Sequence, residues 1–257
     1  YVDAPGEAVL ASYPEVDAWL KYEPEATLPE LLRALGEGTR PTGTHRGIEP
    51  PSLDALPFPA WDLVDLAARD RFCERTVREL GRGSWAFPID GRTLPMVTSR
   101  GCPFACVHCS SNPGRAEGAP KTQRRYSAER LREYLAATQR EHGATRVEVL
   151  DELINVNERH WDGFLDAVSA LGLRFDVPNG MRADYLEPRH FEAMRPLVTT
   201  VSVSAESGVQ RVVTEVVNKR LDLGAIERAA QSAHEAGVPL MIHYIIGLPG
   251  ETAEEVN

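Results

Sequence analysis

The stretch TSRGCPFACVHC, residues 98–109, places three of the four cysteines of the 257-residue chain within eight positions. Cys102, Cys106 and Cys109 form a CxxxCxxC pattern, which is too tight for a disulfide framework and indicates a metal site in a reducing compartment. The fourth cysteine, Cys73, stands alone, and we expect it to be a buried thiol.

Two kinds of metal centre fit three clustered thiols. A structural zinc needs a fourth ligand, and His108 is a poor one because it adjoins Cys109, although the distant His142 or His160 could serve. An iron–sulfur cluster held by three thiolates leaves one iron open to a small molecule, as a catalytic site requires.

Downstream of this loop, strand and helix patterns alternate. Ser127 and Gly143 bound a predicted helix, and a second helix over 158–171 carries one apolar face. Pro188 begins a third helix, a helical stretch covers 212–217, and Asp222 caps a helix that ends at Gly237. The predicted strands are 94–99, 145–151, 174–180, 199–207 and 239–247. This alternation predicts an α/β fold with a parallel sheet, either open or closed into a barrel.

Residues with functional chemistry follow the predicted strands, at the carboxyl ends where α/β proteins place their sites. After the cysteines of the first strand come Asp151 and Glu152, Asn179 to Arg182, Glu206 and Ser207, and Gly247 to Glu251.

The front of the chain has a different composition. Apolar helical patterns at Val9 and Leu10 and over 28–35 flank a short strand over 16–20. Pro and Gly are so dense over 39–62 that we expect a linker without regular structure, then a short helix over 63–70 and irregular chain to residue 94. The chain starts at Tyr1 and stops within a helical pattern, so we expect an internal piece of a longer protein.

The formal net charge of −10 argues against a nucleic-acid partner. No apolar run reaches the roughly eighteen residues of a membrane span, and no signal peptide is recognisable, so we expect a cytoplasmic protein without a membrane partner. The basic run Lys121, Arg124 and Arg125 is either a solvated surface or a contact for an acidic electron donor or an anionic substrate.

The sequence SRGCPFACVHC resembles the cluster loop of the radical S-adenosylmethionine (SAM) enzymes, and the resemblance extends over about residues 90–257. It implies a partial (β/α)6 barrel over 95–257, truncated before its last strand. It also implies a 4Fe-4S cluster on Cys102, Cys106 and Cys109 whose open iron binds SAM, which is cleaved to a 5′-deoxyadenosyl radical. His108 takes the position, often aromatic, that packs near the adenine, and Phe104 packs against the loop or contacts the cofactor.

The same resemblance implies further SAM contacts. Asp151 or Glu152 would pair with the amino group, although either could instead cap the next turn. Arg182 could bind the SAM carboxylate or a substrate anion, or form a salt bridge with Asp184 or Glu187. The remaining contacts would come from Ser204, Glu206 and Ser207 at the ribose and from Gly247 and Gly250 along the adenine.

Residues 1–38 resemble the last strand and helix of a cobalamin-binding α/β domain, with 39–94 as the connecting Pro-rich segment. The KYEPE run, Lys21 to Glu25, keeps both glutamates of the usual Gly-Glu-Pro-Glu turn and has Tyr22 in place of its first glycine.

The resemblance therefore implies a radical SAM enzyme, either a cobalamin-dependent methyltransferase of an unactivated carbon or a related modifier. The alternatives are a radical SAM enzyme without cobalamin and a zinc-stabilised binding module. For the enzyme we expect a small-molecule or peptide substrate and an electron donor such as flavodoxin or ferredoxin.

Overall fold

A computed structural model describes residues 6–80, 91–109 and 122–256. The chain divides into two compact units, the first comprising residues 1–57 and 109–120 and the second residues 58–108 and 121–257. The boundary between residues 57 and 58 falls within the segment 39–94 that the sequence predicts as a connector.

The first unit contains α1 (Gly6–Ser12), β1 (Ala18–Lys21), α2 (Thr27–Gly36) and β2 (Gly43–Arg46). Strands β1 and β2 are parallel, with Ala18 opposite Gly43. The two predicted helices and the first strand are confirmed, whereas the prediction of irregular chain over 39–62 is wrong at β2. No proline falls between Pro41 and Pro50, so the backbone N–H groups of 43–46 remain available to pair with β1.

The turn after β1 is held in an uncommon conformation. Tyr22 has φ 72°, in the left-handed region that favours glycine, and the Arg46 guanidinium carbon lies 4.9 Å from the centroid of its ring. Gly47 approaches the same turn so closely that a Cβ there would lie 2.0 Å from the carbonyl oxygen of Glu23. The turn is therefore packed against the end of β2.

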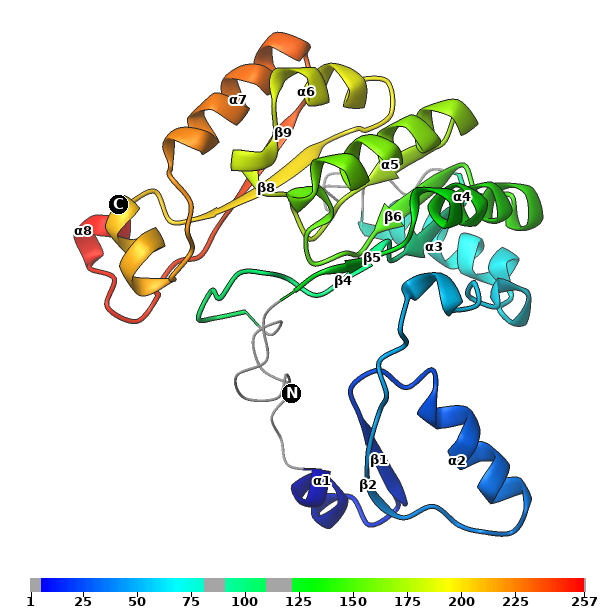
Figure 1. The fold of residues 1–257 in the computed structure, drawn as a ribbon. Helices are drawn as coiled ribbons and strands as arrows, with labels where there is room; N and C mark the ends of the chain where they lie inside the picture. Colours follow the sequence, from blue (N-terminus) through cyan, green and yellow to red (C-terminus); the bar gives the residue numbers. More distant parts are fainter. Residues whose placement is uncertain (1–5, 81–90, 110–121, 257) are drawn as a thin grey trace. The chain divides into compact units, whose positions relative to one another are not determined.

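Five parallel strands form the centre of the second unit (Figure 1). They are β3 (Thr93–Met96), β6 (Arg146–Val149), β7 (Arg174–Asp176), β8 (Val201–Glu206) and β9 (Leu240–Tyr244). The first three pair in the order β3-β6-β7, β8 pairs with β9, and an isolated parallel bridge between Met181 and Val203 joins the two sets. The strands follow each other as the sequence predicts.

The connecting helices are α4 (Ala128–His142), α5 (Glu158–Leu171), α6 (Pro188–Met194) and α7 (Gly224–Ala236). The Ser127 hydroxyl accepts a hydrogen bond from the N–H of Arg130, and Gly143 ends α4 with φ 67°, as predicted. Asp222 instead accepts from the N–H of Gly224, and α7 follows Leu223. Helix α5 packs against β7 and α7 against β9 (Figure 1). In the core, Trp161 stacks on Phe164, and Phe175 meets both rings edge-on.

Two further elements differ from the predictions. Helix α3 spans Leu66–Leu80, because Asp65 accepts a hydrogen bond from the N–H of Ala68 and neither Gly nor Pro interrupts the following residues. The first predicted strand is split into β3 and β4 (Ser99–Arg100), which pairs antiparallel with β5 (Arg124–Arg125). The helical stretch expected over 212–217 is present as a π-helical turn at Val212–Val216, and the helical pattern at the end of the sequence forms the short helix α8 (Ala253–Val256).

Within the described residues, no helix combines the length and apolar character that crossing a membrane requires.

Candidate functional site

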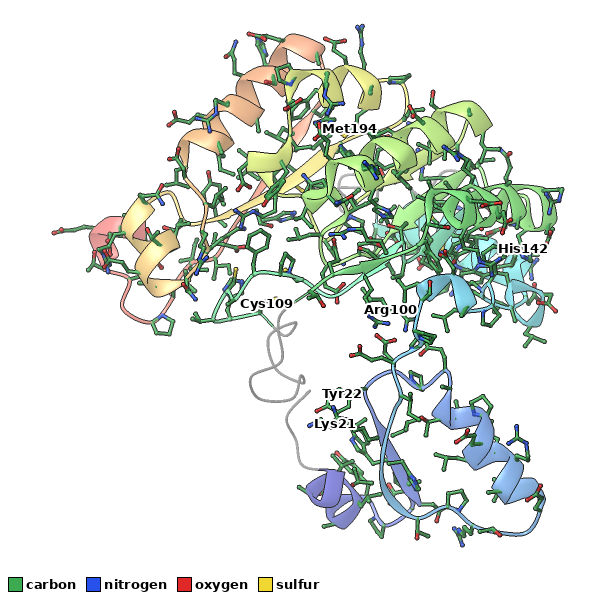
Figure 2. The ribbon with its side chains drawn as sticks, in the orientation of Figure 1. Lys21, Tyr22, Arg100, Cys109, His142 and Met194 are labelled. Carbon is green, nitrogen blue, oxygen red and sulfur yellow. The ribbon has the colours of Figure 1, made fainter. Side chains whose placement is uncertain are left out.

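The cysteine loop, residues 101–109, leaves β4 at the carboxyl side of the strands, and Figure 2 labels Arg100 and Cys109 at its two ends. Cys102, Cys106 and Cys109 are half-buried, and no disulfide joins them among the described residues. Cys106 packs against a buried apolar cluster of Val212, Val217 and Leu248. The loop is therefore seated on the π-helical turn that follows β8.

Two hydrogen bonds hold the second half of the loop. The N–H of Val107 donates to the carbonyl oxygen of Val217 at 2.9 Å, and Asn218 Nδ2 donates to the carbonyl oxygen of Ala105 at 3.1 Å. Asn218 has φ 56°, a conformation that asparagine tolerates better than most residues. We call residues 104–108, together with the segment 217–219 that holds them, the far side of the loop.

Soft thiolate donors suit iron–sulfur clusters, and the loop offers three cysteines that are not tied up in disulfides. In the ranges 6–80, 91–109 and 122–256, no three His, Cys, Asp or Glu side chains are grouped closely enough to hold a metal ion. The fit to a cluster therefore rests on donor chemistry and spacing. Cys73 lies on α3 and is half-buried, so the expectation of a buried thiol is wrong, because α3 has no buried side chain among its described residues.

A buried polar network fixes the start of the loop. Asp151 is fully buried and accepts hydrogen bonds from the N–H of Thr98 at 2.6 Å, from Thr98 Oγ1 at 2.7 Å and from Ser99 Oγ. Its burial raises the pKa of Asp151 to about 6, which these hydrogen bonds partly offset. The Asp151 carboxylate is thus engaged by the backbone and the hydroxyls before the loop.

His160 extends this network. Its Nε2 lies 2.9 Å from Thr98 Oγ1, and because that hydroxyl donates its proton to Asp151, His160 Nε2 acts as the donor. Burial, together with nearby Arg125, lowers the pKa of His160 to about 4, so the ring stays neutral near pH 7. We call Thr98, Ser99, Asp151 and His160 the near side of the loop.

Glu152, unlike its neighbour, is exposed next to the cysteine loop. Its Oε2 accepts a hydrogen bond from the N–H of Gly101 at 3.2 Å. Of the two predicted carboxylates after the second strand, Glu152 is therefore the one open to a ligand.

Glu206 ends β8 in a strained, charged environment. It has φ 70° at a register shift between β8 and β9, and its side chain is mostly buried. Lys219 Nζ donates to Glu206 Oε1 at 2.8 Å and to the carbonyl oxygen of Ser204, while His108 Nε2 lies 3.9 Å from Glu206 Oε2. The structure thus brings Glu206 and His108 together, as the strand-end placement predicts.

Ser204 is half-buried and faces Gly180, whose substitution by a residue with Cβ would bring that atom to 3.2 Å from Ser204 Oγ. Ser207 is buried, and its hydroxyl accepts from the N–H of Val209, so it caps the next turn.

Gly247 has φ 85°, and space is open where its Cβ would stand. Glu251 accepts from the N–H groups of Gly247 and Leu248, which closes the turn that also contains Gly250. A flat group could approach the backbone at Gly247 without meeting a side chain there.

Arg182 is buried and forms a bidentate ion pair with Asp184, with Nε–Oδ1 at 2.8 Å and Nη2–Oδ2 at 2.6 Å. Of the alternatives from sequence, the structure shows the salt bridge. The Arg182 guanidinium carbon lies 4.1 Å from the ring centroid of Phe104, so Phe104 packs against the protein beside the loop.

The other predicted positions have structural partners. Asn179 Nδ2 donates to the carbonyl oxygens of Leu150 and Asp151. Arg124 and Arg125 form β5 beside the start of the cysteine loop, and burial lowers the pKa of Arg125. Lys121 lies outside the described residues.

Sequence reasoning missed the residues that support the site. Lys219, Thr98 and Asn155 are buried polar side chains with partners at the site. Nothing in the local sequence marks Thr98 or Asn155. Lys219 carries one weak signal, because it closely follows the apolar stretch 212–217 and a lysine that is buried there requires a carboxylate partner.

Comparisons with known proteins place this geometry in a family. The sequence model of the Radical SAM superfamily matches residues 96–257. An uncharacterized methyltransferase of Pyrococcus horikoshii is 28% identical over 98% of this chain and 53% of its own length. A cytidylyl-2-hydroxyethylphosphonate methyltransferase of Streptomyces wedmorensis is 25% identical over 89% of this chain and 43% of its own length.

Among solved structures, the apo form of OxsB, a cobalamin-dependent S-adenosylmethionine radical enzyme, matches with a TM-score of 0.51 and 12% identity, over 95% of this chain and 43% of that one. This likeness supports the α/β fold with a partial barrel. The chain spans about half the length of the curated relatives it matches. Because the family match covers more than half of its residues, the chain belongs to the Radical SAM superfamily of enzymes.

Proposed function

We propose that this chain is the cluster-binding and SAM-binding part of a radical SAM methyltransferase or of a related enzyme that modifies an unactivated carbon. Members of the superfamily use SAM and an iron–sulfur cluster. One observation carries the proposal: the CxxxCxxC loop packs beside Glu206 at the carboxyl ends of β8 and β9. The names of the two curated relatives support the methyl-transfer assignment.

Cys102, Cys106 and Cys109 are the proposed ligands of one 4Fe-4S cluster. When bound, that cluster supplies the electron that cleaves the sulfonium of SAM and yields a 5′-deoxyadenosyl radical. The electron itself would come from a donor such as flavodoxin or ferredoxin. Family membership favours this enzyme over a zinc-stabilised binding module.

Four residues are the proposed SAM contacts in the second unit. Glu206 accepts hydrogen bonds from the ribose hydroxyls, and the ammonium of Lys219 keeps this carboxylate charged although it is mostly buried. Glu152 is the exposed carboxylate for the SAM amino group, and the open backbone at Gly247 lies along the adenine. His108 would stack near the same base while its Nε2 faces Glu206.

Residues 1–38 are proposed to derive from a cobalamin-binding α/β domain, with 39–94 as the connector and 95–257 as the radical SAM core. Support comes from the parallel pairing of β1 with β2, which begins just after residues 1–38, and from the turn at Tyr22, whose φ of 72° lies in the region that favours glycine. A substrate that is a small molecule or a peptide fits this class.

Anaerobic reconstitution with iron and sulfide tests the cluster. Single Cys→Ala changes at 102, 106 and 109 should each abolish the visible absorption band and the acid-labile sulfide, because a cubane with three protein ligands loses an anchor. Cys73→Ala is the matched control and should keep both signals. A full band in any of the three variants, or stoichiometric zinc in place of iron, would refute the assignment.

Hydroxocobalamin binding tests the proposed origin of the front unit. Among the residues that the structure describes, that unit has two paired strands, and we expect the 257-residue chain to release cobalamin on a desalting column. A version extended to the length of the curated relatives should retain about one equivalent if cobalamin serves the reaction. Release by the extended protein would leave a radical SAM enzyme without cobalamin.

A further inference from the structure

Arg182 is fixed in place by two other residues of the second unit. Its backbone N–H donates to Asn155 Oδ1 at 3.1 Å, and its carbonyl oxygen accepts from Asn155 Nδ2 at 2.8 Å. Its guanidinium donates to both carboxylate oxygens of Asp184. Because Asn155 is itself buried, both the backbone and the side chain of Arg182 are held before any contact with the cysteine loop is considered.

The face of this guanidinium lies against the loop. The distance from Arg182 Cζ to the ring centroid of Phe104 is 4.1 Å, and the Arg182 side chain is 2% exposed. Tyr185 closes the same contact, with its ring centroid 6.4 Å from that of Phe104. A cation on an aromatic face is worth most when water is excluded, as it is here. Only the planar fork of arginine can stack on Phe104 while its edge binds Asp184.

Arg182 also reaches the segment that holds the other half of the loop. Its Nη2 donates to the carbonyl oxygen of Arg220 at 2.5 Å. This residue follows Lys219, the partner of Glu206, and Asn218, the donor to Ala105. One side chain thus contacts the first half of the cysteine loop directly and the support of its second half through the backbone.

We propose that Arg182 is a positioning residue that fixes the cysteine loop by stacking on Phe104 and by holding the 218–220 segment in register with it. The inference rests on the proposed function only in that the loop carries the cluster ligands. The clamp itself consists of protein contacts, so it can be tested in the protein without metal.

The first test compares Arg182→Met and Arg182→Lys with wild type by hydrogen exchange across 101–108 and by the alkylation rates of Cys102 and Cys106, all in the metal-free chain. Arg182→Met should raise both rates by about tenfold, because the loop can then open without first breaking the contact between Arg182 and Phe104. Arg182→Lys keeps a charge without the fork and should fall between the two. The matched control is Arg189→Met, an exposed arginine that pairs with Glu158, Asp162 and Glu187, and it should leave the loop unchanged.

Folding of Arg182→Met is expected. Arg182 Nη1 is buried without a hydrogen-bond partner among the described residues, so methionine removes this penalty, and Asp184 is exposed enough to be hydrated. If the variant nevertheless fails to fold, Phe104→Leu tests the same contact from the loop, since Arg182 then keeps Asp184.

A double-variant cycle separates positioning from general stability. Phe104→Leu alone should loosen the loop, and the double variant with Arg182→Met should be no looser than Arg182→Met alone, because the stack on Phe104 is already among the contacts that Arg182→Met removes. Independent effects that multiply, or a wild-type loop in either folded single variant, would overturn the proposal. If the wild-type chain does not bind iron on reconstitution, the proposed function is refuted, whereas the result on Arg182 still holds because it is measured in the metal-free chain.

Discussion

The two sides of the cysteine loop are held by different physical means. On the near side, Thr98 and Ser99 are fully buried, their donors meet one buried carboxylate, and a neutral histidine donates to the Thr98 hydroxyl. On the far side, single hydrogen bonds at Ala105 and Val107 accompany a charged pair, Glu206 with Lys219, next to a partly exposed His108. Burial makes the near side part of the core, whereas the far side can respond to a bound ligand.

The largest effect that this comparison predicts comes from Asp151→Ala. Three buried donors from Thr98 and Ser99 would lose their acceptor, and at 1 to 3 kcal/mol each we expect a loss of about 4 kcal/mol in the free energy of unfolding. Urea unfolding measures it. Asp166→Ala, an exposed carboxylate on α5, is the control and should change stability little. A small loss in Asp151→Ala would mean that the near side is not part of the core.

His160→Gln makes the near side testable by pH. The pKa of His160 is lowered from 6.5 to about 4 in the folded protein, so below pH 6.5 the unfolded state binds a proton that the folded state does not. Wild type should lose on the order of 2 to 3 kcal/mol of stability from this group as pH falls from about 6.5 to 4.

The variant lacks this loss, so the advantage of wild type over His160→Gln in the free energy of unfolding should shrink on acidification. The raised pKa values of Asp151 and Asp176 act in the opposite direction, but they do so in both proteins and cancel in the comparison. An advantage that stays constant with pH would show that His160 does not titrate in this way.

On the far side, Glu206→Gln should weaken ligand binding, and it should also lower stability because the buried ammonium of Lys219 loses its carboxylate partner. Glutamine keeps the shape of the side chain and loses the charge, which we expect to weaken SAM binding by about 1 to 3 kcal/mol. Calorimetry on the reconstituted protein measures the affinity, and circular dichroism checks the fold. Unchanged affinity would make Glu206 a structural partner of Lys219 only.

The smallest expected effect is that of Asn218→Gly, which removes the donor to Ala105 but keeps the positive φ at low cost. The loss should be about 1 kcal/mol and local, seen as faster hydrogen exchange of the Val107 amide. An equal loss in global stability would remove the distinction between the two sides.

Local signals made much of the fold predictable. Ser127, Gly143 and Pro188 set helix ends through contacts within a few residues, and the five parallel strands appear in the predicted order. The exceptions are long-range. Strand β2 forms because β1 offers a partner, and the first predicted strand breaks where Thr98 bonds to Asp151, 53 residues away.

The candidate site was predictable to the same extent. The spacing of the cysteines is local and could be read directly, while Asp151 and Glu152 look equivalent in sequence. Only the fold decides that one of them is buried under the loop and the other exposed beside it. Lys219 was missed because its partner, Glu206, meets it through the turn after β8.

The left-handed turn at Tyr22 bears on how such chains are detected. A sequence pattern that demands glycine at the first position of the turn after β1 would reject this chain, although its backbone adopts φ 72° there. The tyrosine ring gains contacts with the Lys21 ammonium and the Arg46 guanidinium, which offset part of the strain of a non-glycine residue. A search profile built on backbone conformation, with aromatic residues permitted beside a basic neighbour, would keep chains of this kind.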